Sequence, residues 1–145
     1  MFRFRLERVL RYRRRREEHL EQECRHLYAA LQREAEQLET LQAACQGQQE
    51  QLYASQGSAL LGEELQLWQR YYQSLTQQAM TQKSLVLKAT AALTAKRQEL
   101  LGARQEKRML EKLGEKARER YLLEHARHDQ RGVDETALAR LRYEH

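Results

Sequence analysis

Proline is absent from this chain of 145 residues, and glycine occurs only six times. Because these two residues most often end helices and form turns, the sequence predicts few breaks between its secondary-structure elements. Charged residues make up 32% of the chain, and Gln, Leu and Ala are also abundant. This usage excludes a globule with a large core and favours long helices that are well exposed to water.

Long apolar runs are missing as well. No stretch approaches the roughly 20 apolar residues of a membrane span, and the basic start is not followed by the apolar segment of a secretory signal. Cysteine occurs only twice, at Cys24 and Cys45, three heptads apart. On one helix that spacing is roughly 30 Å, which excludes a disulfide between them. We therefore expect buried free thiols in a cytoplasmic protein.

Charge is unevenly distributed along the chain. Residues 1–16 contain eight Arg and one Glu, whereas residues 17–56 contain eight acids and two Arg. A basic end followed by an acidic segment predicts that the end meets an acidic partner surface. Nucleic acid and an anionic membrane surface are the alternative partners for Arg11 to Arg16, but Glu17 and Glu18 follow at once and no groove-reading motif is present.

A narrow apolar stripe runs through the second half of the chain. Eleven of the thirteen residues met by alternating steps of four and three are apolar, with Gln82 and Lys96 as the exceptions. This 3.5-residue period predicts a coiled-coil helix, which must pack on a second helix. The stripe consists of Leu61, Leu65, Trp68, Tyr72, Leu75, Ala79, Gln82, Val86, Ala89, Leu93, Lys96, Leu100 and Ala103.

The first half carries a matching stripe, and a short glycine-bearing segment separates the two. Gly57 suits the end of the first helix, and Ser58 suits the N-cap of the second. A connection this short forces the helices to run antiparallel. We therefore predict an all-α hairpin of two long helices in an antiparallel coiled coil. The first stripe consists of Leu20, Cys24, Leu27, Leu31, Glu34, Leu38, Leu41, Cys45, Gln48 and Leu52.

The two predicted helices differ in length. We expect one helical hairpin over 1–145, in which the first helix can pair with the second only to about residue 115. Lys116 to Arg131 then project beyond it, and Gly132 is expected to break or bend the helix. The predicted elements are a helix over 3–55, a turn over 56–62, a helix over 63–131 and a helical tail over 134–143.

Signs of catalysis or ligand chemistry are weak. Gly57 and Gly62 copy half of a phosphate-binding loop, but Glu63 and Glu64 replace the required Lys and Ser or Thr. A two-helix hairpin also offers no pocket that excludes water. The sequence therefore predicts no enzyme, cofactor or metal. Glu124, His125, His128 and Asp129 have helical metal-ligand spacing, for which a solvated polar face is the simpler interpretation.

Aromatic residues gather near the predicted turn. Trp68 and Tyr72 occupy stripe positions, where they are expected to pack, and Tyr53 is expected to lie opposite them. Tyr71 lies beside the stripe, where packing does not need an aromatic, and so it is a candidate partner contact.

The chain resembles the FliJ family of soluble flagellar export proteins over its whole length. The opening from Phe2 to Leu10, the segment from Glu63 to Leu75 and the tail around Asp134 carry the similarity. Unlike some family members, this chain has Ala44 and Gln48 rather than aromatics facing that middle segment.

The resemblance implies a stalk of the flagellar type III export apparatus, peripherally associated with the inner membrane. It implies insertion into the ring of the export ATPase, contact with the export gate and handling of export chaperones. The injectisome stalk is the nearest alternative, and a nucleic-acid-binding or self-associating coiled coil is a more distant one. The implied ring-binding residues are Phe2, Arg3, Arg5, Leu6, Arg8, Val9, Leu10, Arg13, Arg14, Lys116, Arg120 and Arg127, and the implied gate-binding residues are Trp68, Tyr71, Tyr72 and Leu75.

Overall fold

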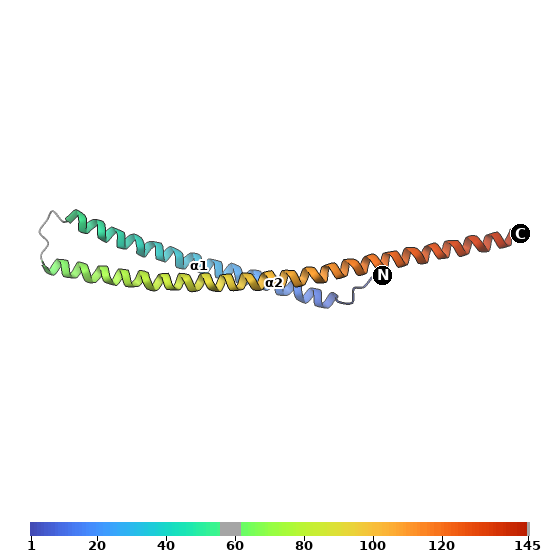
Figure 1. Cartoon of the computed structure of the whole chain (residues 1–145), viewed down its shortest axis with the longest axis horizontal. Coiled ribbons are helices and arrows are strands. Elements are labelled where there is room, and N and C mark those ends of the chain that lie inside the picture. The colour runs from blue at the N-terminus through green and yellow to red at the C-terminus, as the bar shows by residue number, and fades with distance from the viewer. Residues whose placement is uncertain (56–61, 145) are drawn as a thin grey trace. The chain divides into compact units, whose positions relative to one another are not determined.

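Two helices make up the fold. The computed structural model describes residues 1–55 and 62–144. Helix α1 spans Glu7–Ser55 and helix α2 spans Gly62–Tyr143 (Figure 1). They form an antiparallel helical hairpin with a longer second helix, so the predicted fold class is confirmed. The predicted caps at Gly57 and Ser58 lie outside the described residues.

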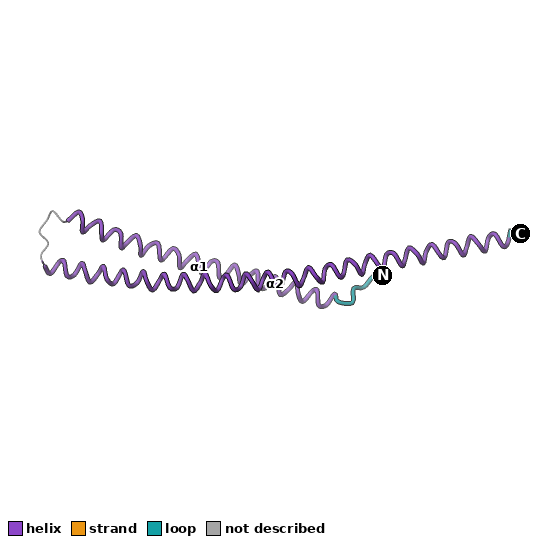
Figure 2. The backbone as a smooth tube through the Cα atoms, in the orientation of Figure 1, coloured by secondary structure: helices purple, strands orange, loops and turns teal. Residues whose placement is uncertain are grey.

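The helix bounds differ from the predicted ones at two places. Met1 to Leu6 are not helical, and this segment is drawn as a loop before α1 in Figure 2. Helix α1 begins at Glu7, whose amide donates to the carbonyl of Phe4 at 3.2 Å. At the other end, α2 continues through Gly132, so the expected break at this glycine is wrong. A single glycine costs a helix only about 1 kcal/mol, which the good helix formers around it offset.

The first of two compact units contains Leu20–Glu99, where α1 and α2 lie side by side. Contacts between the helices run in opposite order along α1 and α2: Gln49 bonds to Tyr72, Glu34 to Gln82 and Glu23 to Lys96. Between Trp68 and Lys96 every residue of the predicted stripe is buried or half-buried, and the residues between them are exposed. The coiled-coil period therefore identifies the contact face correctly.

Polar residues interrupt this apolar contact at Gln82. Its side-chain amide is buried and donates to the Glu34 carboxylate and, at 2.9 Å, to the Glu34 backbone carbonyl. Each residue is a polar exception in its own apolar stripe, and the two meet in one layer. Such a layer specifies helix register, because any shift leaves a polar group buried without a partner.

The second unit contains Met1–His19 and Leu100–His145. Leu10, Leu100 and Ala103 are buried between the helices, and half-buried positions continue along α2 as far as Tyr121. From Leu122 to Glu144 every residue is exposed. Pairing therefore extends to Tyr121, beyond the predicted limit near residue 115, because the non-helical N-terminus lengthens the contact. In the described chain, neither helix has a segment long and apolar enough to span a membrane.

Candidate functional site: the basic end and an aromatic patch

Part of the basic charge is neutralised inside the second unit. Arg13 forms an ion pair with Glu106, and Arg14 lies 3.8 Å from Glu111. Both arginines are among the implied ring-binding residues, but each already has a carboxylate partner on α2. Their charge therefore also serves the contact between the helices.

Glu17 is the most enclosed acid of this network, with a side chain that is only 12% exposed. Its carboxylate lies 2.5 Å from Lys107 Nζ and 3.4 Å from Arg104 Nε. The hydrogen bond from Lys107, aided by the charges of both cations, lowers the pKa of Glu17 below the usual glutamate value, although burial opposes this shift. Glu17 is thus an acid that holds α2 to the basic end of α1.

Two aromatic contacts hold the non-helical N-terminus to α2. The Phe4 ring packs over Gly114, where an added Cβ would meet the ring at 3.4 Å. The Phe2 ring lies 5.4 Å from the Tyr121 ring, centroid to centroid. Phe4 and Tyr121 were not among the implied site residues. The sequence signal that could have predicted the contact of Phe4 with α2 is a glycine, Gly114, at an otherwise apolar position of the helix.

The remaining implied ring-binding residues differ in accessibility. Leu10 is buried and Leu6 half-buried, so both stabilise the pairing of the helices. The others combine cationic and apolar character at the surface. The exposed ones are Arg3, Arg5, Arg8, Val9, Lys116, Arg120 and Arg127.

The aromatic patch of the first unit is divided between packing and exposure. Trp68 and Tyr72 stack with centroids 5.1 Å apart, and the Tyr72 hydroxyl accepts from Gln49 at 2.6 Å. Leu75 is only 7% exposed, so a partner reaches it only if the helices separate. Tyr71 is 52% exposed and is the accessible member. Leu67, one turn earlier on the same face, is also exposed. Its i, i+4 spacing from Tyr71 could have identified it in the sequence as a second member of the exposed patch.

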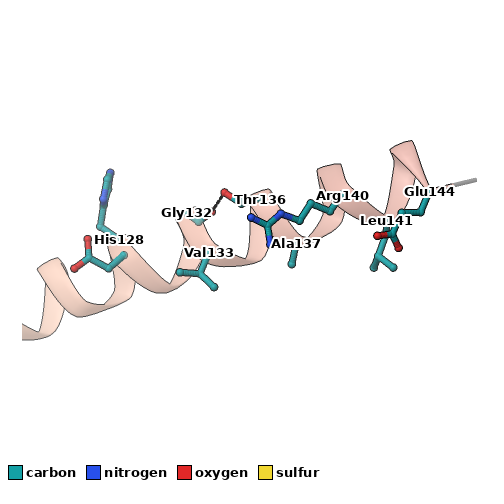
Figure 3. A pocket seen from close by; sticks show the side chains of 9 residues that line it. His128, Gly132, Val133, Thr136, Ala137, Arg140, Leu141 and Glu144 are labelled. Carbon is teal, nitrogen blue, oxygen red and sulfur yellow. Dashed lines mark hydrogen bonds between the residues drawn. The ribbon is translucent and has the colours of Figure 1, made fainter.

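The C-terminal part of α2 has an apolar face of its own. Figure 3 shows Val133, Ala137 and Leu141 on one side of the helix, with the Thr136 hydroxyl bonded to the Gly132 carbonyl. The shallow depression on this side is lined by residues of α2 and by Glu144, which directly follows the helix, so it has no opposing wall. His125 Nδ1 lies 3.1 Å from Asp129 Oδ2, but the described residues contain no group of three or more potential ligands that could hold a metal ion.

Comparison with known families covers nearly the whole chain. The model of the flagellar FliJ protein family matches residues 1–144. The chain belongs to the FliJ family. No curated protein matches it, and no solved structure does.

Membership in the FliJ family confirms the resemblance seen in the sequence. It assigns the chain to flagellar type III export and protein transport, in a stalk role. Since the match extends over both helices, it includes the basic end, the aromatic patch and the C-terminal part of α2.

Proposed function

We propose that this FliJ-family chain is a non-catalytic stalk that enters the hexameric ring of the flagellar export ATPase and raises its ATP turnover. One observation carries the proposal: the family match includes an end of the molecule where exposed cations surround the chain terminus. Arg3, Arg5 and Arg8 have no ion pair among the described residues, in contrast to Arg13 and Arg14. Unpaired cations of this kind are available to an acidic partner.

The ATPase test should avoid the arginines that hold the hairpin together. The double variant Arg8→Glu with Arg127→Glu changes two exposed residues that lack ion pairs in the described chain. We expect the wild-type chain to raise ATP hydrolysis by the export ATPase of its own organism, and this variant to lose most of the stimulation. The matched control is Arg33→Glu with Arg97→Glu, which makes the same charge change on exposed residues of the first unit.

Failure of the wild-type chain to stimulate the ATPase, with both proteins folded, would refute the stalk proposal. Equal loss in the variant and the control would show a general effect of net charge. Circular dichroism spectra of all variants establish that the helices are intact.

We further propose that Tyr71 and Leu67 contact the cytoplasmic domain of the export gate. The support is their exposure beside the packed pair of Trp68 and Tyr72, which holds the backbone in place. Tyr71→Ala should weaken binding to the isolated gate domain by at least about tenfold, as expected for an aromatic anchor. Leu87→Ala, an exposed apolar residue on another face of α2, should leave binding unchanged.

Handling of export chaperones and peripheral attachment to the inner membrane complete the proposed role. Family membership supports both, and copurification of chaperones with the wild-type chain would test the first. Flotation of the chain with membranes, with and without the export gate, would test the second.

A further inference from the structure

A cleft with a cationic rim lies between the N-terminal segment and α2 in the second unit. It has a volume of about 620 Å³. One wall comes from the non-helical start of the chain and the other from two turns of α2. Its lining residues are Arg3, Phe4, Arg5, Leu6, Leu113, Lys116, Ala117 and Arg120.

The rim of this cleft is positive and carries no carboxylate. Arg3, Arg5, Lys116 and Arg120 are exposed, and within residues 1–55 and 62–144 none of them forms an ion pair. Acids do occur nearby on α2, but they do not line the cleft. The rim therefore has four positive charges that the chain itself does not neutralise.

The floor of the cleft is apolar and its walls are anchored. Leu113 is 51% exposed although it lies next to the docked N-terminus, and Phe4, Leu6 and Ala117 are half-buried around it. The contacts of Phe4 with Gly114 and of Phe2 with Tyr121 hold the first wall against the second. The cleft is thus a formed feature of the paired end.

We propose that this cleft binds an acidic segment of a partner protein that inserts one apolar side chain. Carboxylates of the segment would meet the four rim cations, and the apolar side chain would cover Leu113. This inference deepens the proposed stalk function and rests on it, because the cleft lies among the residues that we propose to meet the ATPase ring. Its concave shape and apolar floor fit an inserted side chain better than the flat surface of an anionic bilayer.

The direct test uses a short fluorescent peptide of glutamates around one central phenylalanine, with fluorescence anisotropy as the readout. The wild-type chain should bind it, and binding should weaken as salt is raised. Lys116→Glu with Arg120→Glu should weaken binding at least about tenfold, because two attractions become repulsions. The matched control is Arg108→Glu with Arg118→Glu, two exposed α2 residues outside the cleft, and it should change affinity less than about threefold.

Two altered peptides test the two halves of the recognition. Replacing every glutamate by glutamine should abolish binding, and replacing the phenylalanine by alanine should weaken it by at least about fivefold, because the apolar contact is lost. On the protein side, Leu113→Glu should weaken binding of the original peptide, and circular dichroism should show that the helices remain.

Several results would overturn the inference. These are no binding by the wild-type chain, equal binding to the glutamine peptide, or equal losses in the cleft variant and the control. Sedimentation with vesicles of anionic phosphatidylglycerol tests whether the cleft binds an anionic membrane surface instead of an acidic protein segment. Vesicle binding that Lys116→Glu with Arg120→Glu removes, without peptide binding, would assign the cleft to a membrane and refute the proposal.

The two proposals can fail separately. If the peptide binds in the cleft but the wild-type chain does not stimulate the ATPase, the stalk function is wrong and the recognition chemistry stands. If the wild-type chain stimulates the ATPase and Lys116→Glu with Arg120→Glu stimulates equally well, the cleft does not meet the ring.

Discussion

Helix α2 changes character at Tyr121. From Trp68 to this residue, a side chain is buried or half-buried at each step of the 3.5-residue period, and Leu100 and Ala103 are almost fully covered. After it, every described side chain is exposed, although the backbone remains helical to Tyr143. Packing on α1 is therefore not what keeps the last part of α2 helical. Local propensity and i, i+4 contacts such as His125 with Asp129 remain to do so.

The apolar residues of the two parts also lie on different faces. Val133 and Leu141 are rotated by roughly 120° and 200° from Tyr121 at 100° per residue. The C-terminal apolar face is thus not a continuation of the stripe that packs on α1. The part before Tyr121 belongs to the hairpin, and the part after it is free for a partner.

The largest expected difference between the two parts concerns leucines. Leu100 is 8% exposed and Leu138 is 59% exposed. Leu100→Ala should lower the free energy of unfolding by about 2–4 kcal/mol, because it leaves a cavity between the helices. Leu138→Ala should change it by less than about 0.5 kcal/mol. Urea denaturation followed by circular dichroism measures both, and similar losses would show that the C-terminal part is packed in solution.

Removing a carboxylate should give the next largest difference in stability between the two parts of α2. Glu17→Gln should cost about 1–2 kcal/mol at neutral pH, because Lys107 and Arg104 lose a well-covered carboxylate. In the part of α2 after Tyr121, Asp129→Asn should leave the free energy of unfolding almost unchanged, because the pair of His125 and Asp129 is exposed to water.

The pH dependence of stability has a definite sign. The folded state lowers the pKa of Glu17, so its contribution is present above the pKa of an unfolded glutamate and is lost as pH falls through the lower folded pKa. Wild-type stability should therefore fall more steeply below about pH 5 than that of Glu17→Gln. Parallel curves in urea titrations across this range would contradict the assignment.

Release of the docked N-terminal segment should have a smaller effect. It concerns only the part of α2 up to Tyr121, because the segment packs on Gly114 and Tyr121. Gly114→Val should displace Phe4, because the larger side chain occupies the space where an added Cβ already meets the ring at 3.4 Å. We expect trypsin to cleave after Arg3 and Arg5 about tenfold faster, as measured by mass spectrometry. Gly102→Val is the control, since nothing lies within 4 Å of its added Cβ.

The smallest expected effect tests the C-terminal part. No atom lies within 4 Å of a Cβ added at Gly132, so Gly132→Ala should stabilise the local helix by about 0.5–1 kcal/mol. Amide hydrogen exchange around this residue should slow, while the urea midpoint of the hairpin stays unchanged. A shift of the urea midpoint would show that the stabilities of the two parts of α2 are coupled.

Much of the fold could be predicted because its signal is periodic. The stripe from Trp68 to Ala103 and the stripe of the first half coincide with residues that the structure buries or half-buries, and Cys24 and Cys45, expected to be buried, are half-buried. The break expected at Gly132 was wrong, because a lone glycine carries a penalty too small to end a helix whose neighbours favour it. The candidate site was predicted less completely, since Phe4, Leu67 and Leu113 lie outside the stripes.

The sequence alone determined that two amphipathic helices pair in an antiparallel arrangement. The 3.5-residue spacing of the apolar residues and the short connection between the helices leave few other arrangements. It also determined the basic end, because charge is a property of composition. Only the tertiary structure decided which cations are available: Arg13 meets Glu106, whereas Arg120 forms no ion pair among the described residues and lines a cleft. Ion pairing and cleft formation depend on the register between residues about a hundred positions apart, and spacing along one helix does not contain that information.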